Sequence, residues 1–180
     1  HAFAAYMADV IEHWNKEGVI TFQSTDPMNE PATNYWGANS NKQEGCHFSQ
    51  GESQSKILVA LNEELKNKGI NIIISGTDET NSGYNGGQGG QIDSYNKLSD
   101  EAKAVLGRID THTYTRSSLS DLSALAQSEG KNLWMSEVDG SYTAGTKAGE
   151  MSAALGLAGA MMTEVNGLKC SAWILWNAID

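Results

Sequence analysis

Two glutamates follow two short apolar runs of the sequence. Glu30 comes after Val19–Phe22, in the segment Thr25-Asp-Pro-Met-Asn-Glu-Pro31, and Glu137 comes after Leu133–Met135. Short apolar runs bounded by polar residues predict buried strands. Glutamates at the ends of two parallel strands suit the hydrolysis of a glycosidic bond, in which one carboxyl protonates the leaving oxygen and the other attacks the sugar. We interpret Glu30 as the general acid/base and Glu137 as the nucleophile.

Other polar side chains are placed to assist this pair. Asn29 precedes Glu30 and is expected to donate to a sugar hydroxyl. His112 and Tyr114 end an intervening strand, and alternate residues of a strand share a face, so both can point into one pocket. Tyr114 is expected to donate to Glu137 and keep it charged. The alternative for His112 is a hydrogen-bonded core residue.

Aromatic side chains flank the proposed carboxylates. Trp36 follows the Glu30 loop and Trp176 ends the last predicted strand. Aromatic faces offer an apolar surface to a sugar ring, so we expect both in the pocket, with core packing as the alternative. Trp14 and Trp173 are expected in the core, whereas the pattern around Trp134 suits either place.

Helical and strand periodicities alternate along the chain. An amphipathic helix is expected up to Gly18, and a second one between the first two strands. The expected strands are 19–22, 70–74, 109–114, 132–135 and 172–176. Further helices are expected at 95–106, at 119–127 with Ser118 as its cap, and at 147–165, of which Met151–Met162 is expected to be buried.

This alternation predicts an α/β fold with a parallel sheet, formed by residues 1–180 as one domain. Five strands do not close a (β/α)₈ barrel, which needs eight. We therefore expect the C-terminal part of such a barrel, strands 4 to 8, lacking the first strands. An open doubly wound sheet is the alternative. Unpaired edges on a partial barrel predict low stability for the isolated piece.

The composition excludes several partners. A net charge of −10 offers no basic stripe for nucleic acid or for an anionic membrane surface, whereas a neutral polysaccharide is indifferent to charge. No apolar run approaches the ~20 residues that cross a bilayer. The chain begins with His1 rather than Met, so we expect its true N-terminus, and with it any signal peptide, to lie upstream. Its oligomeric state is open.

No cofactor or metal is expected. The stretch Gly83–Gly90 lacks the Lys-Ser/Thr of a phosphate loop and is interpreted as a rim of the cleft. No second histidine lies at ligand spacing from His112, which argues against a metal site. Cys46 and Cys170 lack the CxxC spacing of a zinc or redox site, and they either pair or remain as buried thiols.

With these residues assembled, the chain resembles glycoside hydrolase family 30 of the clan A retaining glycosidases. The resemblance rests on Asp26-Pro-Met-Asn-Glu-Pro31, Tyr35-Trp36, Gln43-Glu-Gly-Cys-His-Phe48, Ser75-Gly-Thr-Asp-Glu79, His112-Thr-Tyr114, Trp134-Met-Ser-Glu137 and Trp176-Asn-Ala178. It implies an acid/base Glu after the fourth barrel strand and a nucleophile Glu after the seventh, matching Glu30 and Glu137. It also implies a covalent intermediate and carboxyls about 5 to 5.5 Å apart.

The Gln43–Phe48 segment is similar to the branch that contains endo-β-1,6-galactanases. The resemblance thus implies a secreted enzyme that degrades a galactan. Family members that cleave β-1,6-glucan, xylan or glucosylceramide are alternatives. Two other classes remain as rivals: a carbohydrate-binding protein with a degenerate site, and a nucleotide-binding open α/β domain, which would need a glycine fingerprint that the chain lacks.

Overall fold

The structure, a computed structural model, describes residues 1–37, 39, 45–84, 89–139 and 149–177. Its parallel sheet comprises β1 (Ser24–Thr25), β2 (Ile73–Asn81), β3 (Leu106–Thr115), β4 (Asn132–Glu137) and β5 (Ala172–Trp173). The helices among these residues are α1 (Ala2–Glu17), α2 (Glu52–Asn67), α3 (Gln91–Lys97), α4 (Asp100–Val105), α5 (Leu119–Ser128) and α6 (Met151–Leu168).

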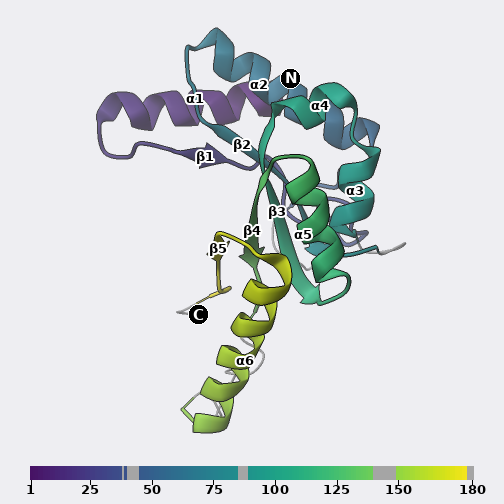
Figure 1. The fold of residues 1–180 in the computed structure, drawn as a ribbon. Helices are drawn as coiled ribbons and strands as arrows, with labels where there is room; N and C mark the ends of the chain where they lie inside the picture. Colours follow the sequence, from purple (N-terminus) through teal and green to yellow (C-terminus); the bar gives the residue numbers. More distant parts are fainter. Residues whose placement is uncertain (38, 40–44, 85–88, 140–148, 178–180) are drawn as a thin grey trace.

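The strands lie side by side in chain order, β1-β2-β3-β4-β5. A doubly wound sheet reverses its strand order at a switch point, so this order excludes that alternative. The sheet curls into an open half-barrel, with α1 and α2 at one end and α6 extending away at the other (Figure 1). The predicted partial barrel is confirmed.

The helices cover the outer face of the sheet through apolar side chains. On α2, the predicted inner face is buried, with Leu58 and Leu61 fully enclosed. They join Leu106, Ile109 and Met135 from the strands in one core cluster. Each such side chain contributes about 1.5–3 kcal/mol when buried. At the end of α1, Gly18 adopts φ 66° and donates its N–H to the Asn15 carbonyl, as predicted for a helix stop.

Several strands differ from their predicted limits. The last strand, β5, ends at Trp173, so Trp176 does not end it as predicted but forms an isolated bridge with Asp139. β3 begins at Leu106 rather than at residue 109.

The first two strands differ most. The first is Ser24–Thr25 rather than Val19–Phe22, and Val19 is 70% exposed. Pairing with the start of β2 selects Ser24–Thr25, because these residues lie opposite Ile73 and Ile74. The second strand extends to Asn81, beyond the predicted end at Ile74, because its polar residues pair along β3. Tertiary pairing overrides the local apolar pattern in both cases.

Two helix predictions also need correction. The helix expected at 95–106 is two helices, α3 and α4, separated at Ser99, whose hydroxyl caps α4 by accepting from the Ala102 N–H. Ser118 precedes α5 as expected but makes no side-chain cap hydrogen bond. Its backbone is left-handed, and its carbonyl accepts from the Leu122 N–H instead.

The expectation of a buried stretch at Met151–Met162 was wrong. Residues 151–162 lie within α6, but Met151, Leu155 and Met162 are each more than 60% exposed. The reason is that α6 contacts α5 and β4 on one side only. Trp14, expected in the core, is 39% exposed at the end of α1. Among the described residues, no helix combines the length and apolar character needed to span a bilayer.

Polar side chains fill the concave interior of the half-barrel. Arg108 donates through Nε and Nη2 to both Asp110 oxygens, at 2.6 and 2.8 Å, and its guanidinium lies 3.5 Å from the Trp134 ring centre. Arg108 also donates to Ser75. Burial, together with Asp78 and Asp110, raises the pKa of the nearby Asp26 well above its usual range. The hydrogen bonds of Arg108 thus join the neighbouring strands β2 and β3 inside the half-barrel.

Candidate active site

Glu30 is held by its own loop and by the neighbouring strand. Its backbone is left-handed, with φ 47°, and its N–H donates to the Asp78 carbonyl at 2.9 Å. Its carbonyl accepts from the Trp36 indole at 2.9 Å, while its carboxylate accepts from the Tyr35 hydroxyl. The side chain is buried, with the residue 7% exposed. Several short-range contacts thus orient one carboxylate.

Glu137 is the last residue of β4, and the sheet register brings it opposite His112 of β3. The Tyr114 hydroxyl donates to Glu137 Oε1 at 2.9 Å, which is the contact expected from the sequence. Burial raises the pKa of Glu137, and the Glu30 and Asp78 charges add to this, while His112 and Tyr114 act in the opposite direction. His112 and Tyr114 therefore offset only part of the rise in the pKa of Glu137 that burial causes. From the sequence we expected Tyr114 to keep Glu137 charged.

His112 lies between the acidic groups and is fully buried. Its Nδ1 is 3.2 Å from Glu30 Oε1 and 3.7 Å from Glu137 Oε1, and its Nε2 is 3.3 Å from Asp78 Oδ2. Burial lowers the pKa of His112, but Asp78, Glu30 and Glu137 outweigh it and raise that pKa to about 10. A protonated imidazole thus supplies positive charge between the two glutamates.

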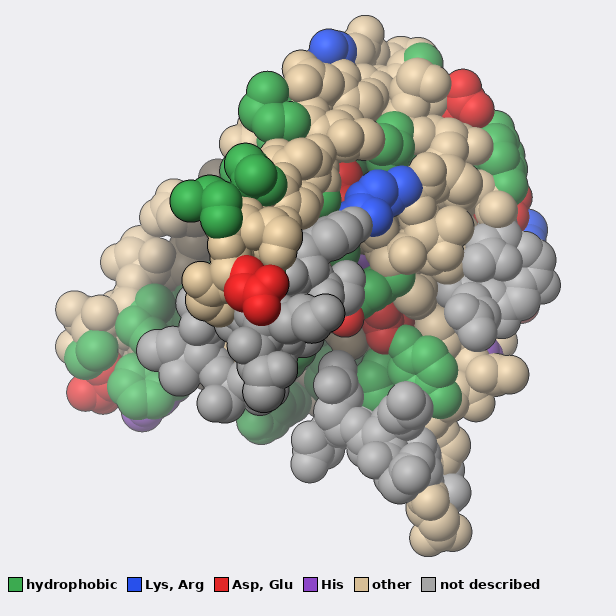
Figure 2. All heavy atoms as spheres, turned by 90° about the horizontal axis from the view of Figure 1, so that it is seen from below, with side chains coloured by type: hydrophobic (Ala, Val, Ile, Leu, Met, Phe, Trp, Pro, Cys, Tyr) green, Lys and Arg blue, Asp and Glu red, His purple; other side chains and the backbone are tan. Residues whose placement is uncertain are grey.

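The two glutamates face one pocket. A carboxylate oxygen from each lies within 4.8 Å of the other and of a His112 nitrogen. The two carboxylates are therefore close enough to act on one sugar bound between them. The pocket encloses about 280 Å³ and is lined by Glu30, Tyr35, Trp36, Thr80, Tyr114, Glu137 and Trp176. Viewed from below, acidic side chains gather near the middle of the face, beside apolar ones (Figure 2).

The structure brings most of the predicted site residues to this pocket. Trp36 and Trp176 line it, as does Tyr114. His112 lies behind the glutamates and is not among the lining residues, and Asn29 is half-buried beside Glu30, also outside the lining. Sequence reasoning missed Thr80.

Asp78 connects the two glutamate segments. Besides binding the Glu30 N–H through its carbonyl, it accepts through Oδ1 from the hydroxyl of Ser136, which precedes Glu137, at 2.5 Å. Its left-handed backbone, φ 60°, costs about 1–3 kcal/mol for a residue other than glycine. Neither Asp78 nor Glu79 lines the pocket, and Glu79 points to Gln54 and Ser94.

Replacing Tyr114 with Phe is expected to reduce kcat/KM by about 10- to 100-fold, because a hydrogen bond to a charged group is lost. Tyr114 lowers the pKa of Glu137, so its removal raises that pKa further. The acidic limb of the pH profile of kcat/KM should therefore move to higher pH. Tyr84→Phe, at an exposed tyrosine, is the control. An unshifted acidic limb would contradict the role given to Tyr114.

Replacing Asp78 with Asn is expected to lower the pKa of His112 below its value of about 10, because the carboxylate that contributes most to raising it is removed. NMR titration of the His112 ring protons measures this shift, with the exposed Asp121→Asn on α5 as control. Because the folded pKa exceeds 6.5, protonation of His112 stabilises the fold fully below about pH 6.5. That contribution to stability is lost as the pH rises through about 10. In urea unfolding, the free energy of unfolding should therefore fall less over this pH range for Asp78→Asn than for the unaltered chain.

Two acidic clusters have spacings that a metal ion could use: Glu30–His112–Glu137 and Asp26–Asp78–Asp110. In the first, His112 Nδ1 already contacts Glu30 Oε1 at 3.2 Å. In the second, Arg108 already pairs with Asp110 through two hydrogen bonds.

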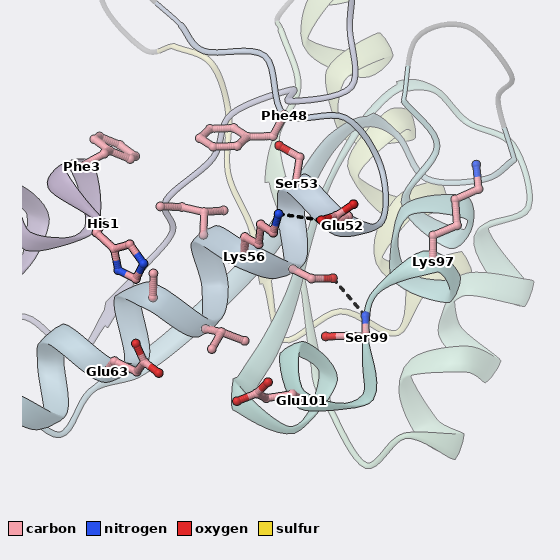
Figure 3. Close-up of a pocket in the computed structure, with 14 residues that line it drawn as sticks. His1, Phe3, Phe48, Glu52, Ser53, Lys56, Glu63, Lys97, Ser99 and Glu101 are labelled. Atoms are coloured by element: carbon pink, nitrogen blue, oxygen red, sulfur yellow. Dashed lines mark hydrogen bonds and ion pairs between the residues drawn. The ribbon is translucent and has the colours of Figure 1, made fainter.

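A larger hollow of about 780 Å³ lies on the outer side of α2 and is mostly apolar (Figure 3). It is lined by residues of α1, α2, α3 and α4 together with the Phe48 segment. Its Glu52 pairs with Lys56 at 2.6 Å. It contains no residue from the end of a strand, so the smaller pocket is the one that suits the predicted chemistry.

Some of the sequence predictions fall, in part or whole, on residues that the structure does not describe. Part of the Gly83–Gly90 stretch and part of the Gln43–Phe48 segment are among these residues, as is Ala178. Cys46 and Cys170 are unbonded thiols, and Cys46 is exposed rather than buried.

Comparisons with known proteins agree with this geometry. A sequence model of O-glycosyl hydrolase family 30 matches residues 1–180. The chain is 28% identical over 179 residues to an endo-β-1,6-galactanase of Hypocrea rufa, covering 98% of this chain and 34% of that protein. It is also 28% identical over 219 residues to an exo-β-1,6-galactobiohydrolase of Bifidobacterium longum subsp. longum, covering 99% of this chain and 14% of that protein.

Solved structures show the same fold. An endo-β-1,6-glucanase superposes with a TM-score of 0.74 at 23% identity, over 97% of this chain and 37% of that one. A family 30 endoxylanase from Clostridium papyrosolvens superposes with a TM-score of 0.63 at 15% identity, over 97% and 39%. The chain therefore spans about a third of the galactanase and of these structures.

Proposed function

The chain belongs to O-glycosyl hydrolase family 30, and on that premise we propose that it cleaves a polysaccharide as a retaining β-glycosidase. Glu137 attacks the anomeric carbon while Glu30 protonates the departing oxygen, so the glycosidic bond breaks and a glycosyl–Glu137 ester forms. Glu30 then deprotonates a water that attacks the ester, and the sugar leaves with its original configuration. The observation that carries the proposal is that Glu30 and Glu137 line one pocket, with a carboxylate oxygen of each within 4.8 Å of the other.

The surrounding residues support both steps. Tyr35 and His112 contact the Glu30 carboxylate, and Tyr114 contacts Glu137. Trp36 and Trp176 offer aromatic surface at the pocket wall for a sugar ring. A binding protein without activity has no use for two facing carboxylates with such contacts, so hydrolysis is the better explanation.

For the substrate we propose a β-1,6-linked galactan. Support comes from the two relatives named for β-1,6-galactan chemistry, each 28% identical to this chain. The proposal includes an extracellular site of action, as the sequence resemblance implies.

The test is to incubate the chain with β-1,6-galactan, β-1,6-glucan and glucuronoxylan and to follow the released sugar by NMR. We expect hydrolysis of the galactan, with the β-anomer appearing first. Initial release of the α-anomer would contradict the retaining mechanism. Preference for another of the three polymers would contradict the substrate alone.

A further inference from the structure

One hydroxyl at the pocket wall has no hydrogen-bond partner. Thr80 lies in β2, is 9% exposed, and lines the pocket shared by Glu30 and Glu137. Its Oγ1 is buried and makes no hydrogen bond to the described residues. A buried hydroxyl without a partner is costly, and such groups are rare in folded proteins. Because Thr80 also lines the pocket, a molecule bound there can supply the missing partner.

The alternation of β2 directs Thr80 inward. Asp78 points into the half-barrel, toward His112 and Ser136. Glu79, the next residue, points outward to the helices, where Gln54 and Ser94 donate to it. Side chains two apart in a strand share a face, so Thr80 lies on the same inner face as Asp78, nearer the carboxyl end of the strand.

We infer that Thr80 contacts the substrate, and that its hydroxyl forms a hydrogen bond with a hydroxyl of the sugar bound between Glu30 and Glu137. This inference rests on the proposed function, because it assigns a further binding residue to the same pocket. A threonine hydroxyl both donates and accepts, which matches a sugar hydroxyl. Rotation about the Cα–Cβ bond turns Oγ1 toward the pocket when the sugar arrives.

The chain offers a matched control for this residue. Thr113 of β3 also has a fully buried hydroxyl without a partner, but it lies between His112 and Tyr114 on the opposite face and does not line the pocket. Threonine and valine have nearly the same shape. Thr80→Val and Thr113→Val each remove one unpartnered hydroxyl, so neither should lower the melting temperature.

The experiment compares Thr80→Val, Thr80→Ser and Thr113→Val with the unaltered chain. The probes are β-1,6-galactobiose, β-1,6-glucobiose and xylobiose, each assayed for hydrolysis and for binding by calorimetry. Thr80→Val should lose about tenfold in affinity and in kcat/KM for the preferred sugar, as expected for one lost hydrogen bond. Thr80→Ser, which keeps the hydroxyl, should recover most of this loss, and Thr113→Val should match the unaltered chain.

The pattern across sugars locates the contact. Equal losses on galactobiose and glucobiose assign it to a hydroxyl that both share, whereas a loss on one alone assigns it to the 4-hydroxyl, where the two differ. Thr80→Val binding as well as the unaltered chain, or Thr113→Val losing as much, would overturn the inference. If the unaltered chain binds a sugar but hydrolyses none, the proposed function fails and the binding comparison still decides the role of Thr80. If it neither binds nor hydrolyses any probe, both are overturned.

Discussion

A Glu137→Gln variant is expected to lose at least about 10⁴-fold in kcat while it stays folded and still binds the substrate. The amide keeps the shape of the side chain and can remain beside the Tyr114 hydroxyl, but it cannot attack the anomeric carbon. Steady-state kinetics on the galactan measure the loss, and calorimetry with galactobiose measures the retained binding.

Asp139→Asn is the matched control, because it makes the same chemical change two residues further along, at an exposed position. It should keep kcat within a few fold. Azide provides a second test: with Glu137→Ala, azide enters from the face that the carboxylate vacated, so the product should be the α-glycosyl azide. A Glu137→Gln variant with near-normal kcat would remove Glu137 from the nucleophile role.

A Glu30→Ala variant is expected to lose about 10²- to 10⁴-fold in kcat/KM on the galactan, which needs an acid to protonate its leaving oxygen. On a 2,4-dinitrophenyl β-glycoside the leaving group departs without a proton, so kcat/KM should stay within about tenfold of normal. Hydrolysis of the glycosyl–Glu137 ester then becomes slow, because the variant also lacks the base that deprotonates the attacking water. A burst of dinitrophenol should therefore precede the steady state.

Glu79→Gln tests whether this selectivity belongs to Glu30 alone. Glu79 is a buried glutamate of β2 that accepts from Gln54 and Ser94 and does not line the pocket. Its replacement should lower the melting temperature and affect both substrates alike. Equal losses by Glu30→Ala on the natural and the activated substrate would argue against an acid role.

The local arrangement around Glu30 explains why these effects should be large. Its left-handed backbone, the Asp78 carbonyl and the Trp36 indole hold the carboxylate in one orientation. Neither Glu30 nor Asp78 is a glycine, so the backbone strain at both must be offset by the contacts that join them. A rigid pair of segments can keep two carboxylates at a distance that suits one sugar carbon.

Local patterns in the chain predicted the alternation of helices and strands, the partial barrel, and one pocket shared by the two glutamates, Tyr114, Trp36 and Trp176. The catalytic roles given to these residues stay predictions. The features of the fold and the pocket arise from short apolar runs and from motifs such as the one ending at Glu30, which need few distant contacts to be recognised. Strand limits were less predictable. β1 and β2 are placed by their pairing partners, so the apolar run at Val19–Phe22 misled the prediction.

Thr80 and the contacts that surround the glutamates could not be found in this way. Thr80 lies in a strand that local hydropathy ended at Ile74, and only pairing with β3 carries the strand on to the pocket. His112 is charged because carboxylates from three separate segments surround it. Such contacts join residues distant in the chain, and their electrostatic effect depends on burial and distance, which only a folded molecule has.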